Sequence, residues 1–149
     1  MSPQITITRR LPATADEVYW EWLDPDALVE WMCPLPARPT RIELDPKVGG
    51  RYRFDIEDGS GRLVVTGRYL RLEPGRLLSF TWSCDTWADP TVASIVTVSL
   101  SPRGEECEMT LTHERLPAGE VPTHRAGWAA SVEQLAARRT GLSGRAEDL

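Results

Sequence analysis

The stretch between residues 40 and 114 alternates apolar and polar side chains with a period of two. In RYRFDIE, residues 51–57, the side chains of Tyr52, Phe54 and Ile56 share one face, as in a strand that is buried on one side. Four turn signals interrupt the stretch: Gly49-Gly50, DGSG at 58–61, Pro74-Gly75 and PRGEE at 102–106. Strands joined by such short turns pair antiparallel with their neighbours. The sequence therefore predicts about six antiparallel strands here, with Gly49 or Gly50 at positive φ in the first turn.

One long segment with helical periodicity follows these strands. Its apolar residues recur at roughly helical spacing, at Val121, Trp128, Val132 and Leu135. They predict a helix of about 18 residues, from about residue 120 to 139, with one apolar stripe. Gly141 suits the end of this helix, and residues 142–149 are expected to form a polar tail. The helix is predicted to lie across the concave face of the sheet, because no other segment can cover that face.

The N-terminal part contributes one strand and two short helices. Residues 5–8, ITIT, alternate as a strand does. Thr14 and Glu17 have the spacing of a capping box, and Asp24-Pro25 has the pattern of an N-cap followed by proline at the first helical position. Two helices directly after one strand do not fit a β-α-β unit. Residues 1–149 are predicted to form a single α+β domain with an ordered core over about residues 4–140.

Composition and charge exclude several classes of function. The net charge is −5 and the 17 basic residues are scattered, so we expect no nucleic-acid partner. No apolar run reaches the roughly 20 residues that cross a bilayer, and the N-terminus lacks the pattern of a signal peptide, so membrane insertion is not expected. The three cysteines are widely spaced and form no CxxC motif, which predicts reduced thiols in a cytoplasmic protein.

The two histidines, His113 and His124, are the first candidates for chemistry. A metal site needs three or more converging ligands, and the sequence has no HExxH motif, so we expect no metal and no cofactor. A structural role, with bonds to nearby backbone, is the expectation for both residues. His113 ends a strand on the apolar face and is the one weak candidate for a catalytic acid or base. Neither a GxSxG motif nor an activated Cys or Ser is present.

The tryptophans indicate a cavity. The chain has six of them, and Trp22, Trp31, Trp82 and Trp128 fall in segments predicted to face one interior. Trp22 is interpreted as core, whereas several indoles around a curved sheet are typical of a pocket wall with a few polar groups. Gly127 costs its helix about 1 kcal/mol relative to Ala, which is understandable if the helix makes a close approach there. The last helix is therefore predicted to be a lid, with Trp128 pointing into the cavity.

Five motifs, in their order and spacing, resemble one known family. They are LPATADEVYWEWLDPDALVEWM, the VGGRYRF turn, GRYLRLEPGRLLSFTW, the hairpin from TVSL to MTLTHERLP, and HRAGW at the head of the last helix. Together they span about residues 4 to 139. They resemble the helix-grip fold of the START/SRPBCC superfamily, in the branch of homologues of the Aha-type activator of the heat-shock-90 chaperone ATPase. The resemblance implies a curved sheet of about six to seven strands and a hydrophobic ligand cavity under the long helix.

Three functions from different classes stay open at this point. The first is a binding protein for a small hydrophobic or aromatic molecule, without turnover. The second is an enzyme of the cyclase or hydrolase kind in which His113 orients or deprotonates the substrate. The third is a protein-interaction module with a chaperone or a second copy of the chain as partner, which should expose an apolar patch of several hundred Å2. The predicted cavity lining is Trp31, Met32, Leu35, Phe54, Trp82, Val98, Met109, His113, Trp128 and Val132.

Overall fold

The computed structural model describes the backbone of residues 4–147 and the side chains of residues 4–142. Strands and helices follow one another in the predicted order. They are β1 (Ile5–Leu11), α1 (Ala15–Glu21), α2 (Pro25–Trp31), β2 (Arg38–Leu44), β3 (Arg51–Glu57), β4 (Arg62–Glu73), β5 (Leu77–Cys84), β6 (Ser94–Arg103), β7 (Glu106–Glu114), the 3-10 turn η1 (Ala118–Glu120) and α3 (Val121–Glu147).

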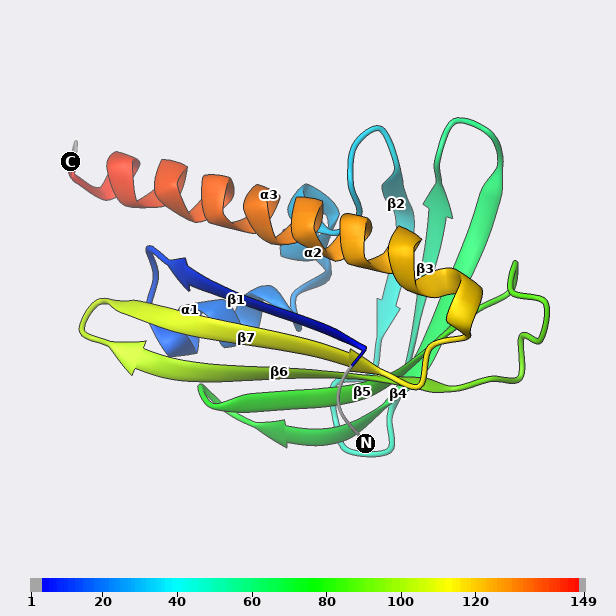
Figure 1. Cartoon of the computed structure of the whole chain (residues 1–149). Coiled ribbons are helices and arrows are strands. Elements are labelled where there is room, and N and C mark those ends of the chain that lie inside the picture. Colours follow the sequence, from blue (N-terminus) through cyan, green and yellow to red (C-terminus); the bar gives the residue numbers. More distant parts are fainter. Residues whose placement is uncertain (1–3, 148–149) are drawn as a thin grey trace.

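The strands form one antiparallel sheet in the order β1-β7-β6-β5-β4-β3-β2. Strands β2 to β7 are a meander, and β1 joins its far edge with Ile5 opposite His113. Figure 1 shows α3 running across one face of the sheet, with α2 beside it, while α1 packs against β6 and β7. The predicted α+β architecture, a curved antiparallel sheet gripped by a long C-terminal helix, is confirmed.

Local sequence signals explain where the short helices begin. The Thr14 hydroxyl accepts the Glu17 N–H at 3.1 Å, and the Glu17 carboxylate accepts the Thr14 N–H at 2.9 Å, so the capping box predicted for α1 is present. The Asp24 carboxylate accepts the Asp26 N–H at 3.0 Å, with Pro25 as the first helical residue. Both predicted helix starts are confirmed, because each cap satisfies an N–H group that has no partner within its helix.

The turn between β2 and β3 depends on its two glycines. Gly49 has a φ of 83°, and a Cβ on Gly50 would lie 2.0 Å from the Asp45 carbonyl oxygen. Backbone bonds hold this turn against β4, since the Gly49 N–H donates to Tyr69 and the Tyr69 N–H donates to Gly50, at 2.8 and 2.9 Å. The predicted turn with a positive φ is confirmed.

The last helix is longer than the sequence indicated. We expected an end at Gly141, but α3 continues through this residue to Glu147, so the predicted polar tail from residue 142 is helical over most of its length. A single glycine costs a helix only about 1 kcal/mol. The signal that Gly141 provides is therefore too weak to end a helix that is held firmly just before it.

Buried ion pairs provide that hold by fixing α3 to α1. Glu21 is only 3% exposed, and its carboxylate accepts hydrogen bonds from Arg138 at 3.0 Å and from Arg139 at 2.9 Å. Arg139 also donates to Glu17 at 2.6 Å. Since these contacts lie in the C-terminal half of α3, they fix the helix axis and leave its N-terminal half to cover the sheet near β3, β4 and β5.

Candidate ligand-binding pocket

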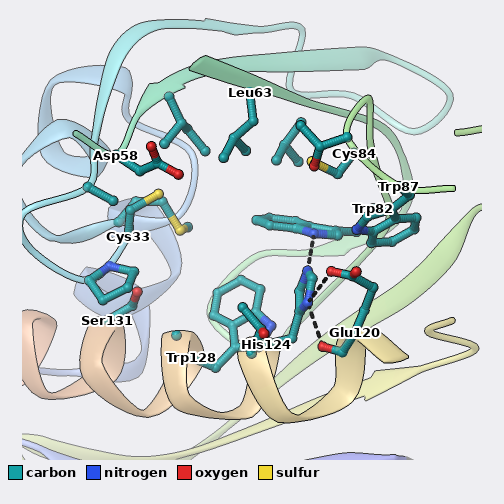
Figure 2. Close-up of a pocket in the computed structure, with 18 residues that line it drawn as sticks. Cys33, Asp58, Leu63, Trp82, Cys84, Trp87, Glu120, His124, Trp128 and Ser131 are labelled. Atoms are coloured by element: carbon teal, nitrogen blue, oxygen red, sulfur yellow. Dashed lines mark hydrogen bonds and ion pairs between the residues drawn. The ribbon is translucent and has the colours of Figure 1, made fainter. Parts of the chain in front are cut away.

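A pocket of about 350 Å3 lies under the N-terminal half of α3. Its walls come from α3, from the β3–β4 hairpin, from the end of β5 with the loop after it, and from the segment after α2 (Figure 2). The lining residues are Met32, Cys33, Pro34, Ala37, Ile56, Asp58, Leu63, Val65, Trp82, Cys84, Thr86, Trp87, Glu120, Thr123, His124, Gly127, Trp128 and Ser131.

Gln134 on α3 fixes one wall of this pocket. Its side-chain amide donates to the carbonyl oxygens of Trp31 and Cys33, at 2.8 and 2.7 Å, and its side-chain oxygen accepts the Leu35 N–H at 3.2 Å. The loop after α2 thus has its backbone groups satisfied by one helical side chain. Because irregular backbone needs such partners when it is partly buried, the position of this wall is well defined.

Two tryptophans form the inner wall, and each gives its indole N–H to a histidine. Trp82 and Trp128 lie with ring centroids 5.1 Å apart. Trp128 donates to Nδ1 of His113 at 2.9 Å, and Trp82 donates to Nε2 of His124 at 3.3 Å. The rings of His113 and His124 meet edge to face with centroids 5.6 Å apart. We call these four residues the Trp-His cluster.

The hydrogen bonds of His113 fix its tautomer. Nδ1 accepts the Trp128 N–H, so the ring proton sits on Nε2 and is donated to the Ser94 hydroxyl at 2.8 Å. The Ser94 hydroxyl in turn donates to the Trp82 carbonyl at 2.6 Å. Burial, and to a smaller extent the neighbouring His124, lower the pKa of His113 to about 3. His113 is therefore neutral near pH 7, has both nitrogens occupied, and lies behind the pocket wall.

His124 reaches the pocket itself and is held in one orientation. Its Nδ1 lies 2.9 Å from the Glu120 carbonyl oxygen, to which it donates, and its Nε2 accepts from Trp82. Trp87 packs edge to face on the same imidazole, at 5.7 Å between centroids. Figure 2 shows His124 between Trp82 and α3, with the Glu120 side chain beside it. Both indole N–H groups of the inner wall are thus paired, and the wall presents mainly apolar ring surface.

The thiols in the pocket are not arranged for nucleophilic chemistry. Burial raises the pKa of the Cys33 thiol to about 12, so it stays protonated and unreactive near neutral pH. The Cys84 sulfur lies 3.1 Å from the Thr86 hydroxyl.

Among the described residues, no three His, Cys, Asp or Glu side chains converge as a metal site requires. No helix in that same part of the chain is long and apolar enough to cross a membrane.

The structure divides the ten residues of the predicted lining into three groups. Met32, Trp82 and Trp128 line the pocket. Leu35 does not, because the loop after α2 turns its side chain outward and leaves it 68% exposed. The remaining six are buried in the core beside the pocket: Trp31, Phe54, Val98, Met109, His113 and Val132.

Trp128 lies both at the pocket and in the core, and Gly127 does not have the role that we expected. Trp128 borders the pocket, but it is only 4% exposed and also packs on Trp22 and Trp82, so it belongs to the core as much as to a lid. A Cβ on Gly127 would meet Pro34 at 3.9 Å, which is ordinary contact. The close approach that we inferred for Gly127 is therefore wrong, and this glycine instead leaves open space at the pocket.

Several lining residues were not predicted, and some had a usable signal. Ile56 shares a face with Tyr52 and Phe54, so the alternation of β3 already placed it inside. Leu63 and Val65 alternate in the same way on β4. Trp87 and Cys33 lie in irregular segments, where periodicity carries no information about direction.

A curved antiparallel sheet gripped by a C-terminal helix, with an aromatic pocket between them, defines a helix-grip protein of the START/SRPBCC superfamily. The family model described as "Activator of Hsp90 ATPase homolog 1-like protein" matches residues 12–139, and the chain belongs to this family. Membership supports a ligand-binding or cyclase-like use of the fold and specifies no ligand. No curated protein matches the sequence.

Solved structures agree with this assignment. Protein CV1439 from Chromobacterium violaceum is 30% identical with a TM-score of 0.85, over 91% of this chain and 95% of that one. The AHSA1 protein SPO3351 from Silicibacter pomeroyi is 23% identical with a TM-score of 0.77, over 90% and 95% of the two chains. DynU16, from the dynemicin biosynthetic locus, is 24% identical with a TM-score of 0.71, over 89% of this chain and 45% of that one. The last two show likeness of fold alone.

Proposed function

We propose that this protein binds a small hydrophobic or aromatic molecule in the pocket under α3. The observation that carries the proposal is the pairing of Trp82 and Trp128 with two histidines. Indole N–H groups facing an apolar space would otherwise lose their hydrogen bonds at a cost of about 1–3 kcal/mol each. The pairing satisfies the Trp128 N–H from behind the wall and the Trp82 N–H through His124 at the pocket, and it supports a wall that offers ring surface to an apolar ligand.

The size of the pocket limits the ligand. A cavity of about 150 Å3 in another protein binds benzene, so a pocket of about 350 Å3 has room for a molecule with two fused rings. This volume is at the lower end of the range for small-molecule sites. We therefore propose a ligand of one to two rings, smaller than a lipid with long acyl chains.

A catalytic role for His113 has less support. An acid or base must come within hydrogen-bond reach of its substrate, whereas His113 is fully buried behind the pocket wall and uses both ring nitrogens there. An interaction with a chaperone or a second copy of the chain stays a prediction. Such a role would use exposed large apolar side chains, and within residues 4–142 these lie on five different segments: Trp20, Val29, Leu35, Val48 and Leu70.

Two glycines of α3 offer a matched test of the proposal. Gly127 lines the pocket, whereas Gly141 does not, and a Cβ on Gly141 would have no neighbour within 4 Å. In Gly127→Leu the new side chain should fill the pocket, while Gly141→Leu changes the same helix without touching it. Both changes raise helix propensity, so neither should unfold the protein.

The measurement is calorimetric titration with 2-naphthylmethanol, a neutral two-ring probe. We expect saturable binding to the unaltered protein and to Gly141→Leu, and affinity at least about tenfold weaker in Gly127→Leu, since the ligand must then compete with a covalently attached side chain. Equal binding by both variants would place the probe outside this pocket. No saturable heat with any of the three proteins would contradict the proposed function.

A further inference from the structure

The charges on the pocket all have one sign. Its lining includes the carboxylates of Asp58 and Glu120, and none of the described lining residues is Arg or Lys. Figure 2 shows the two carboxylates on opposite sides of the pocket, with Trp82 and Trp128 between them. A molecule that enters therefore meets negative potential from two directions.

Asp58 is built to stay ionised and to keep one oxygen free. Its Oδ1 accepts hydrogen bonds from the Ser60 N–H, the Ser60 hydroxyl and the Gly61 N–H, at 3.0, 2.9 and 3.0 Å. The bonds from Ser60, more than that from Gly61, lower the pKa of Asp58. Its Oδ2 has no partner among the described residues. The β3–β4 turn thus fixes the carboxylate through one oxygen and leaves the other available at the pocket.

Glu120 is also available, because its contacts with the Trp-His cluster use its backbone. The Glu120 carbonyl oxygen accepts the His124 N–H at 2.9 Å, whereas its side chain is 36% exposed and its carboxylate lies 3.8 Å from the imidazole. The carboxylate can therefore turn toward a ligand without disturbing the position of His124. Three indoles, from Trp82, Trp87 and Trp128, also line the pocket, and indole faces attract cations more strongly than other aromatic rings do.

From these contacts we infer that the pocket selects ligands with an aromatic or apolar body and a protonated amine. This inference rests on the proposed function and names the ligand class for the same site. The body occupies the pocket against the wall that Trp82 and Trp128 form together, and the ammonium group pairs with Asp58 or Glu120 at the rim. A ligand with a carboxylate in place of the amine meets two like charges and no cation to compensate it.

Three probes with one ring system separate this inference from the proposed function. They are 2-naphthylmethylamine, 2-naphthylmethanol and 2-naphthylacetate, which at pH 7.5 are cationic, neutral and anionic. We expect calorimetry on the unaltered protein to give the amine an affinity at least about fivefold above that of the alcohol, and the carboxylate the weakest binding of the three. This preference should shrink as sodium chloride is raised, because rim charges are screened.

Variants assign the preference to the two carboxylates. In Asp58→Asn with Glu120→Gln, the ratio of amine to alcohol affinity should fall at least about twofold. Asp89→Asn is the matched control, since Asp89 holds a similar turn through Thr91 but does not line the pocket. In Asp89→Asn the ratio of amine to alcohol affinity should equal that of the unaltered protein.

The outcomes are distinct. If the alcohol binds and the amine binds no better, or if the double variant keeps the full preference, the inference is wrong and the binding function stands. If none of the three probes binds, both fail together. The comparison of probes and of salt concentrations on the unaltered protein decides the question even if a variant does not fold.

Discussion

The indole N–H of Trp128 donates to Nδ1 of His113 at 2.9 Å, and His113 is fully buried. This bond joins α3 to β7, which lies between β1 and β6 in the sheet. It also decides the protonation of the imidazole, because a nitrogen that accepts a hydrogen bond cannot carry a proton. Protonation of His113 would break the bond and leave a charge buried in an apolar core.

The first prediction concerns the pH dependence of stability. His113 has a pKa of about 3 in the folded protein and an ordinary value near 6.5 in the unfolded chain. Between these values the unfolded chain binds the extra proton, so the free energy of unfolding falls as the pH is lowered through this window. The loss from His113 should be about 2 kcal/mol between pH 7 and pH 5.

The control for this prediction is His113→Gln. Glutamine has an oxygen to accept the Trp128 N–H and an amide to donate to Ser94, but it does not titrate. Urea unfolding at pH 7, 6 and 5 should show a smaller loss of stability in the variant than in the unaltered protein. If the stability of both proteins falls equally from pH 7 to pH 5, His113 takes up its proton in the folded protein as well, contrary to its hydrogen bonds.

A second prediction compares the two Trp-His pairs. Trp128→Phe and Trp82→Phe remove the same atoms and the same N–H donor. The first leaves Nδ1 of the fully buried His113 unpaired, whereas the second exposes Nε2 of His124, whose side chain is 14% exposed at the pocket and can be hydrated. Trp128→Phe should therefore destabilise by about 1–2 kcal/mol more than Trp82→Phe. The measurement is urea unfolding, and equal unfolding midpoints for Trp128→Phe and Trp82→Phe would contradict the prediction.

The sequence predicted the sheet and the order of its elements because those depend on local patterns. The alternation in β3 already places Tyr52 and Phe54 inside, and the capping signals at Thr14 and Asp24 fix where two helices begin. Such patterns tell which face of an element is buried. They do not tell how deep a residue lies on that face.

The position of a residue along the buried face decides whether it lies in the core or at the pocket. That position depends on contacts between segments that are not neighbours in the sequence. Phe54 and Ile56 share one face of β3, yet only Ile56 borders the pocket, near the tip of the β3–β4 hairpin. The pairing of Trp82 with His124 joins β5 to α3, and that of Trp128 with His113 joins α3 to β7. No spacing rule gives such hydrogen bonds. The sequence therefore placed Trp82, His113 and Trp128 in one predicted lining, but it did not predict their hydrogen-bond partners or the place of His124 beside them.

A third prediction tests the ion pairs that hold α3 in place. Glu21→Gln keeps the shape of a 3% exposed side chain but leaves Arg138 and Arg139 without its charge. Loss of a buried partner in this way should cost about 2–4 kcal/mol. Glu133→Gln is the control, since its pair with Arg9 lies at the surface, with Glu133 63% exposed, and should cost at most about 1 kcal/mol. Similar losses in urea unfolding would show that α3 does not depend on Glu21.

The last prediction concerns the turn that closes β2 onto β3. A Cβ at Gly50 would lie 2.0 Å from the Asp45 carbonyl and 2.9 Å from the Lys47 carbonyl, and both are backbone atoms that cannot rotate away. Even Gly50→Ala should thus destabilise the fold by at least about 2 kcal/mol, and Gly50→Val by more. Gly61, in the turn of the next hairpin, has no atom within 4 Å of its Cβ position, so Gly61→Ala should change stability by no more than about 0.5 kcal/mol. Thermal unfolding of the three variants measures the difference. If Gly50→Ala unfolds at the same temperature as Gly61→Ala, the turn moves freely and does not hold β3 against β4.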